Sequence, residues 1–295
     1  MIPVIVGLDI GGTKTAVVVE TRDGARVVET ELPSEDWDAE PLEYGIRWVA
    51  HRIASVLLEG HEVEAVGIGA QGLDSDEIAT AFSTGLAEFG YRAVAVNDAA
   101  LLVPAAGFES GLGVISGTGS IAVGQNAQGG YVITGGWGWV IGDEAGAAGL
   151  VREATKAALS AHDDGLADDG LLDALTAGFG VADAERLARA VNDEPTMDNW
   201  GPRAPVVFAA ADTGSALAAR VIDAAADNLV RLVTQLVTRG AVGSAVVAAG
   251  SVIVGQPRLF DAFVRGVAAR HPGLSVHLLR VPPVEGAVQL ARRLI

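Results

Sequence analysis

The sequence of 295 residues contains no cysteine. Disulfide bonds, thiolate zinc sites, iron–sulfur clusters and cysteine nucleophiles are therefore excluded. This single absence removes whole families of metalloproteins and thiol enzymes from consideration.

Positive charge is also scarce. Lysine occurs only at Lys14 and Lys156, and the formal net charge is −17 with an isoelectric point near 4.6. Nucleic acid and anionic membranes would be repelled over most of such a surface, so neither is expected as a partner. A polyphosphate ligand would have to be held mainly by backbone N–H groups and a metal ion.

Long apolar runs are missing as well. Residues 1–10 are apolar, but no cationic segment precedes them and Asp9 interrupts them, so we expect a buried strand rather than a signal peptide. Residues 241–254 are shorter than the roughly 20 residues of a membrane-spanning helix and include Gly243 and Gly250. We therefore expect a soluble, cytoplasmic protein.

The chain opens with β-branched runs at residues 4–10, 16–20 and 26–32, with glycine turns between them. This pattern is typical of an antiparallel meander. Strand patterns then alternate with helical ones, which predicts parallel pairing through crossover helices and an α/β fold. The predicted segments are a helix at 43–59, a strand at 63–70, a helix at 76–88 and a strand at 92–96.

A second strand, glycine turn and strand unit at residues 113–124 resembles the first. Gly-Thr-Lys-Thr-Ala-Val at 12–17 corresponds to Gly-Thr-Gly-Ser-Ile-Ala at 117–122, which suggests a duplicated domain with one hairpin per copy. The remaining chain is mostly helical. We expect helices at 144–159, within 171–191 and at 215–239, a loop at 161–170, a central strand at 245–249, and then a helix that Pro257 helps to begin.

The first glycine turn differs from a Walker loop, because Thr13 stands where the lysine should follow the last glycine and residues 16–19 continue as a strand. The turn is therefore a hairpin tip whose N–H groups could cradle phosphate, with Asp9 placed to hold hydrated magnesium. A plain glycine hairpin with a surface lysine is the alternative.

Residues 67–72 match the G-x-G-x-x-G spacing of dinucleotide-binding proteins. However, Gly67 and Gly69 lie inside the apolar run, and no acidic residue follows about 20 positions later at a strand end. Close backbone packing explains these glycines better, and an oxidoreductase remains a minor alternative.

Two further segments carry candidate side chains. Asn97-Asp98 follows a buried strand, where a carboxylate opens toward the ligand crevice of an α/β fold and could act as a base or simply cap the next helix. Residues 137–144 combine tryptophans, glycines and two carboxylates, a surface suited to sugars. The alternative is that Asp143 caps a helix and the tryptophans are core.

Taken together, these motifs resemble the N-acetylglucosamine kinase and BadF/BadG-type ATPase family of the actin-like sugar kinase superfamily. The matching segments occur in the family's order and continue to Pro-Val-Glu-Gly-Ala at 283–287, so the resemblance covers nearly the whole chain. They are Leu-Asp-Ile-Gly-Gly-Thr-Lys-Thr at 8–15, Asn-Asp-Ala at 97–99, Ser-Gly-Thr-Gly-Ser at 116–120, and Gly-Gly-Trp-Gly to Gly-Asp-Glu at 135–144.

The resemblance implies two actin-like (ribonuclease H-like) domains with mixed five-stranded sheets flanked by helices and hinged about a central cleft. Residues 1–105 would form the first domain, with the C-terminal helix 284–295 packing back on it, and residues 106–283 the second. The resemblance implies an ATP-dependent kinase that uses Mg²⁺ and phosphorylates the primary 6-hydroxyl of an amino sugar, with N-acetylglucosamine as the preferred candidate. It also implies a homodimer.

Carried over residue by residue, the resemblance makes Asp98 the base and Asp9 the magnesium ligand. Gly250 and Ser251 would bind the nucleoside. The phosphate-binding residues would be Gly11, Gly12, Thr13, Lys14, Thr15, Gly117, Thr118, Gly119 and Ser120. The sugar-binding residues would be Asp36, Trp37, Gln71, Asn97, Gly136, Trp137 and Asp143.

Some positions depart from the family pattern. Asp36 or Glu35 stands beside Trp37 where the family brings an Asn to the sugar, and a carboxylate there would also suit the free ammonium of glucosamine. Ala145-Gly146 replaces the family's Gly-Ser, and Gln71 stands near a usual small polar residue.

The alternatives to an N-acetylglucosamine kinase are a glucosamine kinase and a regulatory ATPase without sugar transfer. Zinc-bearing repressors and glucokinases share the first hairpin, and activators of hydroxyacyl-CoA dehydratases share the ATP motifs. Both need cysteines that this chain lacks.

Overall fold

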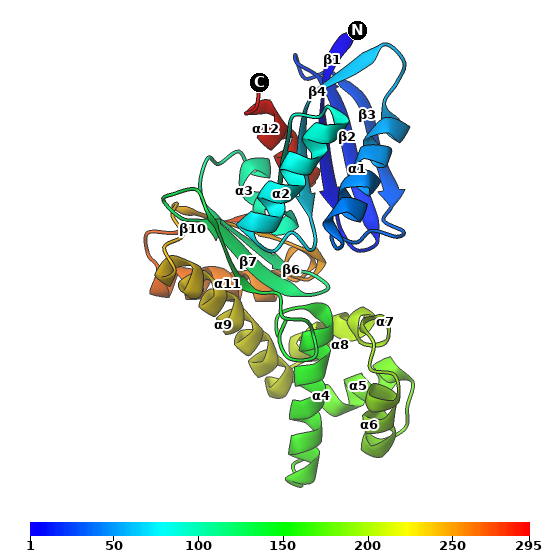
Figure 1. Ribbon diagram of the computed structural model, residues 1–295. Helices are drawn as coiled ribbons and strands as arrows, with labels where there is room; N and C mark the ends of the chain where they lie inside the picture. Colours follow the sequence, from blue (N-terminus) through cyan, green and yellow to red (C-terminus); the bar gives the residue numbers. More distant parts are fainter.

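The computed structural model describes residues 1–295 as two five-stranded sheets with helices packed on their faces (Figure 1). The strand order is β3-β2-β1-β4-β5 in the first sheet and β10-β9-β6-β7-β8 in the second. In both sheets three strands form an antiparallel meander. A fourth strand pairs in parallel with the first strand of the meander, and a fifth pairs in parallel with the fourth. The two sheets thus share one order and one set of directions, as the paired glycine turns predicted.

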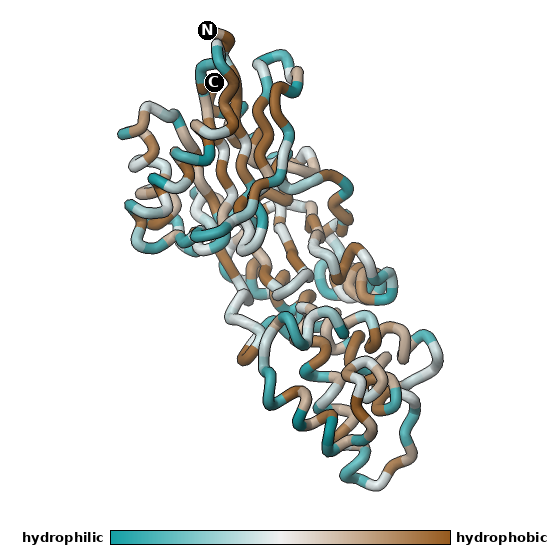
Figure 2. The backbone as a smooth tube through the Cα atoms, turned by 90° about the vertical axis from the view of Figure 1, so that its right-hand side faces the viewer, coloured by the Kyte–Doolittle hydropathy of each residue, from teal (hydrophilic) through white to brown (hydrophobic).

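The strands of the first sheet are β1 (Ile2–Ile10), β2 (Lys14–Thr21), β3 (Arg26–Pro33), β4 (His61–Ala70) and β5 (Ala93–Asn97). Those of the second are β6 (Leu112–Ser116), β7 (Ser120–Gln125), β8 (Tyr131–Gly135), β9 (Ala245–Ala249) and β10 (Ser275–Leu278). Central β1 and β9 are buried on both faces, whereas the charged edge strand β3 is largely exposed, which discourages pairing with other chains. Figure 2 shows the apolar strands of both sheets within the molecule and the hydrophilic segments mainly at loops.

The longer helices of the first half and the C-terminus are α1 (Leu42–Val56), α2 (Asp76–Leu86) and α12 (Val284–Arg292). Those between them are α4 (Ala147–Asp163), α5 (Leu171–Phe179), α6 (Ala184–Asp193), α8 (Ala204–Asp212), α9 (Ala216–Thr238) and α11 (Pro257–Arg270). Short helical turns are η1 (Ala87–Phe89), η2 (Asp98–Leu101), α3 (Leu102–Ala105), α7 (Met197–Trp200), η3 (Gly201–Arg203) and α10 (Ser251–Gly255).

Capping residues determine where several of the longer helices begin. Ser75 caps α2 by accepting a hydrogen bond from the N–H of Ile78 at 3.2 Å, and Ser215 caps α9 through Ala218 at 3.0 Å.

A shared helical layer lies between the two sheets. Helices α1 and α2 pack on one face of the first sheet, and α9 packs on the far face of the second. The segment η2–α3 and helix α12 fill the space between, where Leu101 and Ala287 belong to the same apolar cluster as Val123 of β7. The residues directly after β5 are therefore held by both sheets.

Glycines in β1 and β4 let α12 approach the first sheet closely. An ideal Cβ on Gly67 would lie 1.9 Å from the carbonyl oxygen of Ala287, and one on Gly7 would lie 2.6 Å from a Cγ of Val288. Because the two glycines are register partners, they form one bare strip beneath the helix. Close backbone packing of Gly67 is thus confirmed, and α12 lies on β1 and β4. The division of the chain after residue 105 stays a prediction.

Most predicted elements are observed, with shifts at their ends. The predicted strand 245–249 is β9, and the predicted helix 215–239 is α9 (Ala216–Thr238). Helix α4 begins three residues later than predicted, because residues 143–146 form a turn closed by a 2.8 Å bond from the N–H of Gly146 to the carbonyl of Asp143. It also continues to Asp163, so the predicted loop at 161–170 is shorter than expected.

No helix taken singly has the length and apolar character required to cross a membrane. One pair, Met197–Asp212 with Ala216–Thr238, meets that test only when the two helices are combined, and they are bent by 120°.

Candidate functional site

Two carboxylates lie at one end of the first sheet. Asp9 is the penultimate residue of β1, and Asp98 follows the last residue of β5. Since β1, β4 and β5 run parallel, their carboxyl ends meet at the same edge, where α/β folds bind ligands. Burial, and then the charge of Asp98, raise the pKa of Asp9 to about 7. Burial raises the pKa of Asp98 to about 6, and the charge of Asp74 adds to the rise against the hydrogen bond from Ala99.

Asp98 is positioned by a small hydrogen-bond network. Its Oδ1 accepts the N–H of Ala99 at 2.9 Å, and the Oδ1 of Asn97 accepts the same N–H at 3.0 Å. The Nδ2 of Asn97 donates to the Oδ1 of Asp74 at 2.8 Å, which fixes the orientation of the amide. Asn97 is therefore the cap of η2, and Asp98 keeps lone pairs available for another proton donor.

The tip of the first hairpin has unpaired donors. Thr15 closes the hairpin opposite Ile10, and a strand follows, so the element is not a Walker loop. The N–H groups of Gly12 and Thr13 make no hydrogen bond within the chain, and both residues are exposed. Such a pair of amides can receive phosphate oxygens without any bulk positive charge.

The side chains near this tip are already engaged. The hydroxyls of Thr15 and Ser34 form a buried 2.8 Å hydrogen bond, and the Nζ of Lys14 lies 2.9 Å from a carboxylate oxygen of Glu31. Lys14 and its carboxylate partner are both exposed, so that ion pair is weak and open to exchange with a phosphate. Gly11 is engaged too, because its N–H donates to the carbonyl of Lys14 at 3.0 Å.

Gln71 joins this hairpin to the predicted sugar residues of the first sheet. An ideal Cβ on Gly12 would lie 3.0 Å from the Oε1 of Gln71, and the indole N–H of Trp37 donates to the carbonyl of Gln71 at 3.2 Å. Trp37 also packs on Trp48, with ring centroids 5.1 Å apart. Asp36 beside it is exposed with φ 61°, so its carboxylate faces solvent.

The tip of the second hairpin is held between two segments. On one side, an ideal Cβ on Gly117 would lie 3.5 Å from the backbone of both Gly250 and Ser251. On the other side, an ideal Cβ on Gly146 would lie 2.7 Å from the Cα of Gly119. The serine that the family pattern places at position 146 would therefore not fit here. The N–H groups of Thr118 and Gly119 make no hydrogen bond within the chain, as at the first tip.

Three predicted ligand residues line one cavity of about 160 Å³: Ser120, Trp137 and Asp143. Ser120 Oγ and Asp143 Oδ1 are buried there without a hydrogen-bond partner, and burial raises the pKa of Asp143. Trp137 is 76% exposed, so it is not core. Asp143 does not cap α4 with its side chain, because the N-cap residue of that helix is Gly146. Gly136, with φ 72°, shapes the turn before Trp137 against the side chain of Ile121.

Sequence reasoning missed the far wall of this cavity, which Asn228, Arg231 and Gln235 of α9 form. Their i, i+3, i+7 spacing puts them on one helical face, and that polar spacing could have indicated the wall. Only the apolar face of this helix was used to predict it.

The predicted phosphate and sugar residues do not all meet in one cavity. Ser120 lies on the α9 side of the second sheet, whereas the neighbouring Ile121 packs toward η2 on the other side. Gln71, Trp37 and Asn97 lie at the edge of the first sheet. The predicted set therefore forms two groups, one on each sheet.

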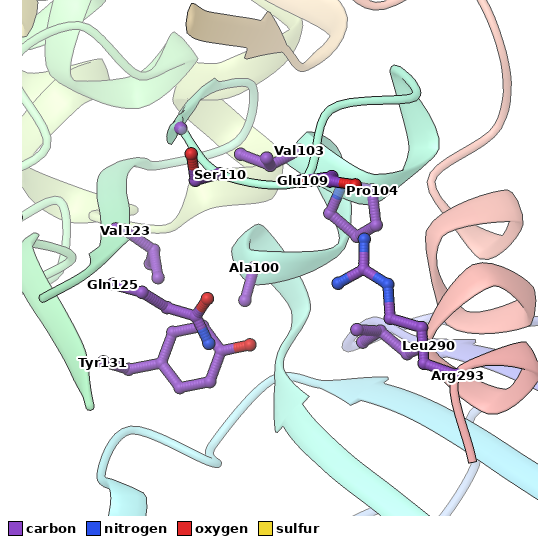
Figure 3. A pocket seen from close by; sticks show the side chains of 12 residues that line it. Ala100, Val103, Pro104, Glu109, Ser110, Val123, Gln125, Tyr131, Leu290 and Arg293 are labelled. Carbon is purple, nitrogen blue, oxygen red and sulfur yellow. The ribbon is translucent and has the colours of Figure 1, made fainter. Parts of the chain in front are cut away.

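A cavity of about 50 Å³ between α3, β7 and α12 contains none of the predicted residues (Figure 3). Burial raises the pKa of its Tyr131 to about 12, against the charge of Arg293. Across this joint, the backbone N–H of Tyr131 donates to the carboxylate of Asp76 on α2 at 2.9 Å. The contact ties β8 to the first sheet's helices.

The donor set suits Mg²⁺ bound together with a nucleotide better than a metal held by protein alone. No group of three or more His, Asp or Glu side chains is placed to hold a metal. Mg²⁺ commonly uses one or two carboxylates and takes its other ligands from water and phosphates. Asp9, near Asp98 and beside the first hairpin tip, fits that pattern.

Two mixed sheets, each with a glycine-tipped hairpin, define the actin-like class of two-domain folds. The chain belongs to the BadF/BadG/BcrA/BcrD ATPase family, whose sequence model matches residues 6–288.

The individual relatives that the chain resembles include proteins named as sugar kinases. The chain is 27% identical over 308 residues to an N-acetylmuramic acid/N-acetylglucosamine kinase of Clostridium acetobutylicum, covering 98% of each protein. It is 22% identical to an N-acetyl-D-glucosamine kinase of Dictyostelium discoideum over 80% of each. A ROK family glucokinase from Streptomyces griseus, solved with glucose and AMPPNP, shares the fold with a TM-score of 0.59 at 19% identity, covering 98% of both chains.

Proposed function

We propose that this protein is an ATP-dependent sugar kinase that transfers a phosphoryl group to the primary 6-hydroxyl of an amino sugar. N-acetylglucosamine is the preferred candidate substrate. The observation that carries the proposal is the combination of one partly buried, hydrogen-bonded carboxylate, Asp98, with unpaired N–H groups at two matching hairpin tips. The names of the two curated relatives support the choice of an amino sugar.

Different residues would bind the phosphates, the nucleoside and the magnesium ion. The N–H groups of Gly12 and Thr13, and of Thr118 and Gly119, would receive phosphate oxygens of ATP, while Gly250-Ser251 would border the nucleoside. Mg²⁺ held by Asp9 would neutralise phosphate charge. Most of the rate enhancement would come from positioning and electrostatic stabilisation.

Asp98 would accept the proton of the sugar hydroxyl as that oxygen attacks phosphorus. Its pKa of about 6 leaves it mainly ionised at neutral pH and still basic enough to take a proton. The amide of Asn97 would hold the adjoining backbone in place through Ala99 and Asp74.

On the sugar itself, Trp37 and Gln71 would contact one side, and Trp137 with Asp143 the other. The exposed carboxylate of Asp36 would also suit a free ammonium group, which makes glucosamine the competing substrate. Glu35 and Asp36 are both exposed, so either carboxylate would be accessible to the sugar.

A regulatory ATPase is the second candidate. Both hairpin tips present unpaired N–H groups, whereas the predicted sugar residues form two separate groups. Nucleotide binding is therefore better supported than sugar binding. The homodimer and the cytoplasmic location remain proposals; sedimentation velocity would test the first.

Coupled ADP release across N-acetylglucosamine, glucosamine, N-acetylmannosamine and glucose tests the function. We expect an amino sugar to raise the rate well above the basal ATPase, with the product carrying phosphate on O6 by NMR. Release that no sugar stimulates would reject the kinase and favour the regulatory ATPase. Stimulation by glucose alone would reject the amino-sugar assignment.

A further inference from the structure

The segment between β4 and α2 makes hydrogen bonds to three different parts of the molecule. Asp74 accepts the Nδ2 of Asn97 at 2.8 Å, and Ser75 is the N-cap of α2. Asp76, the first residue of α2, accepts the backbone N–H of Tyr131 on the second sheet. Three consecutive side chains therefore join the loop of the predicted base, helix α2 and the edge of the second sheet.

The contact between Asp76 and the second sheet is specific to one backbone position. Both carboxylate oxygens of Asp76 lie 2.9 Å from the nitrogen of Tyr131, and β8 is an edge strand, so no further strand competes for that N–H. An ideal Cβ on Gly130 would lie 2.9 Å from the Oδ2 of Asp76, so the glycine leaves room for the carboxylate. Asn126 fixes the turn before β8, because its Oδ1 accepts the N–H of Gly130 at 3.0 Å. A charged acceptor on a backbone N–H makes one of the stronger hydrogen bonds of a protein.

Helix α2 is also bonded directly to the strand that precedes the predicted base. In Figure 1, this helix extends from the first sheet toward the second. The N–H of Ala95 in β5 donates to the Oγ of Ser83 in α2 at 2.8 Å. Before the other end of the helix, Asp74 holds Asn97, the last residue of β5. Because the helix and its preceding loop are bonded to β5 at two places and to the second sheet at a third, a displacement of the second sheet acts on β5 through a rigid element.

Strand β7 connects this contact to the predicted phosphate-binding tip of the second hairpin. It begins at Ser120, the last residue of that tip, and ends at Gln125, directly before the turn that leads into β8. Tyr131 pairs with Gln125 across the two strands, so the residue that bonds Asp76 belongs to the same ladder. A shift of the tip therefore also shifts the N–H that Asp76 accepts.

We propose that Asp76 is a positioning residue that makes the orientation of the predicted base, Asp98, depend on the position of the second sheet. The second sheet acts on Asp76 through the N–H of Tyr131. Two residues earlier in the same segment, Asp74 acts on Asn97, whose Oδ1 caps the turn that begins with Asp98. The base is aligned when β8 is seated against α2 and loses that alignment when β8 moves away. The consequence for catalysis rests on the proposed function, whereas the coupling of the two backbone sites does not.

Amide hydrogen exchange, measured by NMR on the intact protein, tests the coupling without reference to activity. In Asp76→Ala, the N–H of Tyr131 should exchange about tenfold faster or more, because it loses its acceptor. The N–H of Ala99, which Asn97 and Asp98 both accept, should exchange about threefold faster or more, although Asp76 does not contact it. Faster exchange at Tyr131 alone, or unchanged exchange at both sites, would overturn the proposal.

Glu77→Ala is the matched control for charge and for the stability of the helix. Glu77 is the next residue, is also exposed and lies in the same first turn of α2, but it does not bond the second sheet. Both exchange rates should stay at their wild-type values, and an acceleration that Glu77→Ala shares with Asp76→Ala would overturn the proposal. Asp76→Asn keeps one side-chain oxygen that can accept the N–H, so it should restore most of the protection at both sites.

Gly130→Ala perturbs the same contact from the second sheet. Its Cβ would press on the carboxylate of Asp76 while both hydrogen-bonding residues stay unchanged, so the test does not depend on how Asp76→Ala affects the start of α2. Exchange at Ala99 should be accelerated in Gly130→Ala as well. The double variant with Asp76→Ala should exchange no faster than Asp76→Ala alone, because both substitutions act through one contact. Fully additive effects would overturn the proposal.

Steady-state kinetics relates the coupling to catalysis. With the accepted sugar, Asp76→Ala should lower kcat roughly threefold to tenfold and leave KM for ATP and for the sugar within about twofold, since Asp76 lies outside the predicted substrate-binding residues. An unchanged kcat beside accelerated exchange at Ala99 would overturn the positioning role. If the wild type phosphorylates no sugar, the proposed function is rejected, and the exchange data alone uphold or overturn the coupling.

Discussion

Asp74 accepts a 2.8 Å hydrogen bond from the Nδ2 of Asn97, and the Oδ1 of the same asparagine caps the turn that begins with Asp98. Asn97, the residue before the predicted base Asp98, is thus held in place by the loop that follows β4.

We predict that Asp74→Ala lowers kcat about tenfold, because a hydrogen bond to a charged acceptor contributes roughly 1.5–3 kcal/mol. Steady-state kinetics should show KM for ATP within about twofold of the wild type. Asp261→Ala, an exposed carboxylate on α11, is the control and should change neither parameter.

Replacing Asp98 by Asn should reduce sugar phosphorylation on the order of a hundredfold or more, because the amide cannot accept the hydroxyl proton. ADP affinity, measured by calorimetry, should change little, since the phosphate-binding donors are backbone groups elsewhere. A variant that phosphorylates sugar at the wild-type rate would remove Asp98 from the role of base.

Trp137 should contribute to sugar binding and not to folding. It is 76% exposed, so Trp137→Ala should leave the thermal midpoint nearly unchanged while raising KM for the sugar about tenfold through lost stacking. Trp139 provides the contrast, because its ring packs on Trp200 with centroids 4.8 Å apart. Trp139→Ala should lower the midpoint. If Trp137→Ala leaves KM for every accepted sugar unchanged, Trp137 does not contact substrate.

Gly67→Ala should destabilise the protein by about 3 kcal/mol or more, because the added Cβ would lie 1.9 Å from the carbonyl of Ala287 and α12 would have to shift. Urea unfolding measures this change. Gly273→Ala is the matched control, since no atom lies within 4 Å of its added Cβ. Equal midpoints for the two variants would contradict the close seating of α12 on β4.

The metal-free protein should lose stability as pH rises from about 4 to 7. The pKa of Asp9 is raised from 3.8 to about 7, mainly by burial, and that of Asp98 from 3.8 to about 6. The folded state therefore holds more protons than the unfolded chain in this window, and the unfolding free energy falls with increasing pH. For Asp9 alone, a change of three pKa units corresponds to on the order of 4 kcal/mol.

Chemical unfolding at a series of pH values, with and without Mg²⁺ and ADP, checks this dependence. Asp9→Asn should flatten the curve and be more stable than the wild type at pH 8 without metal. If the unfolding free energy of the wild type rises through the same pH window, the pKa values of these two carboxyl groups are not raised in the folded state.

Local sequence signals were sufficient for much of the fold. The β-branched runs and glycine turns predicted both hairpins, and their similarity predicted two related sheets, because strand formation and tight turns depend on neighbouring residues. The apolar spacing of 215–239 predicted α9 almost to its ends. The exclusion of a Walker loop was also correct, since only Thr13 and the following strand were needed to decide it.

Contacts between distant segments were decided by the tertiary structure. The sequence by itself determined the hairpins, the similarity of the two strand–turn–strand units and the absence of thiol chemistry, all of which depend on residues close in the chain or on composition. It did not determine that Asp74 holds Asn97, that Gly146 faces Gly119, or that Asn228 and Arg231 of α9 wall the cavity of Asp143. Those relationships join residues up to 88 positions apart, from Asp143 to Arg231, and arise only when helices and sheets pack, because packing rather than local preference selects which faces meet.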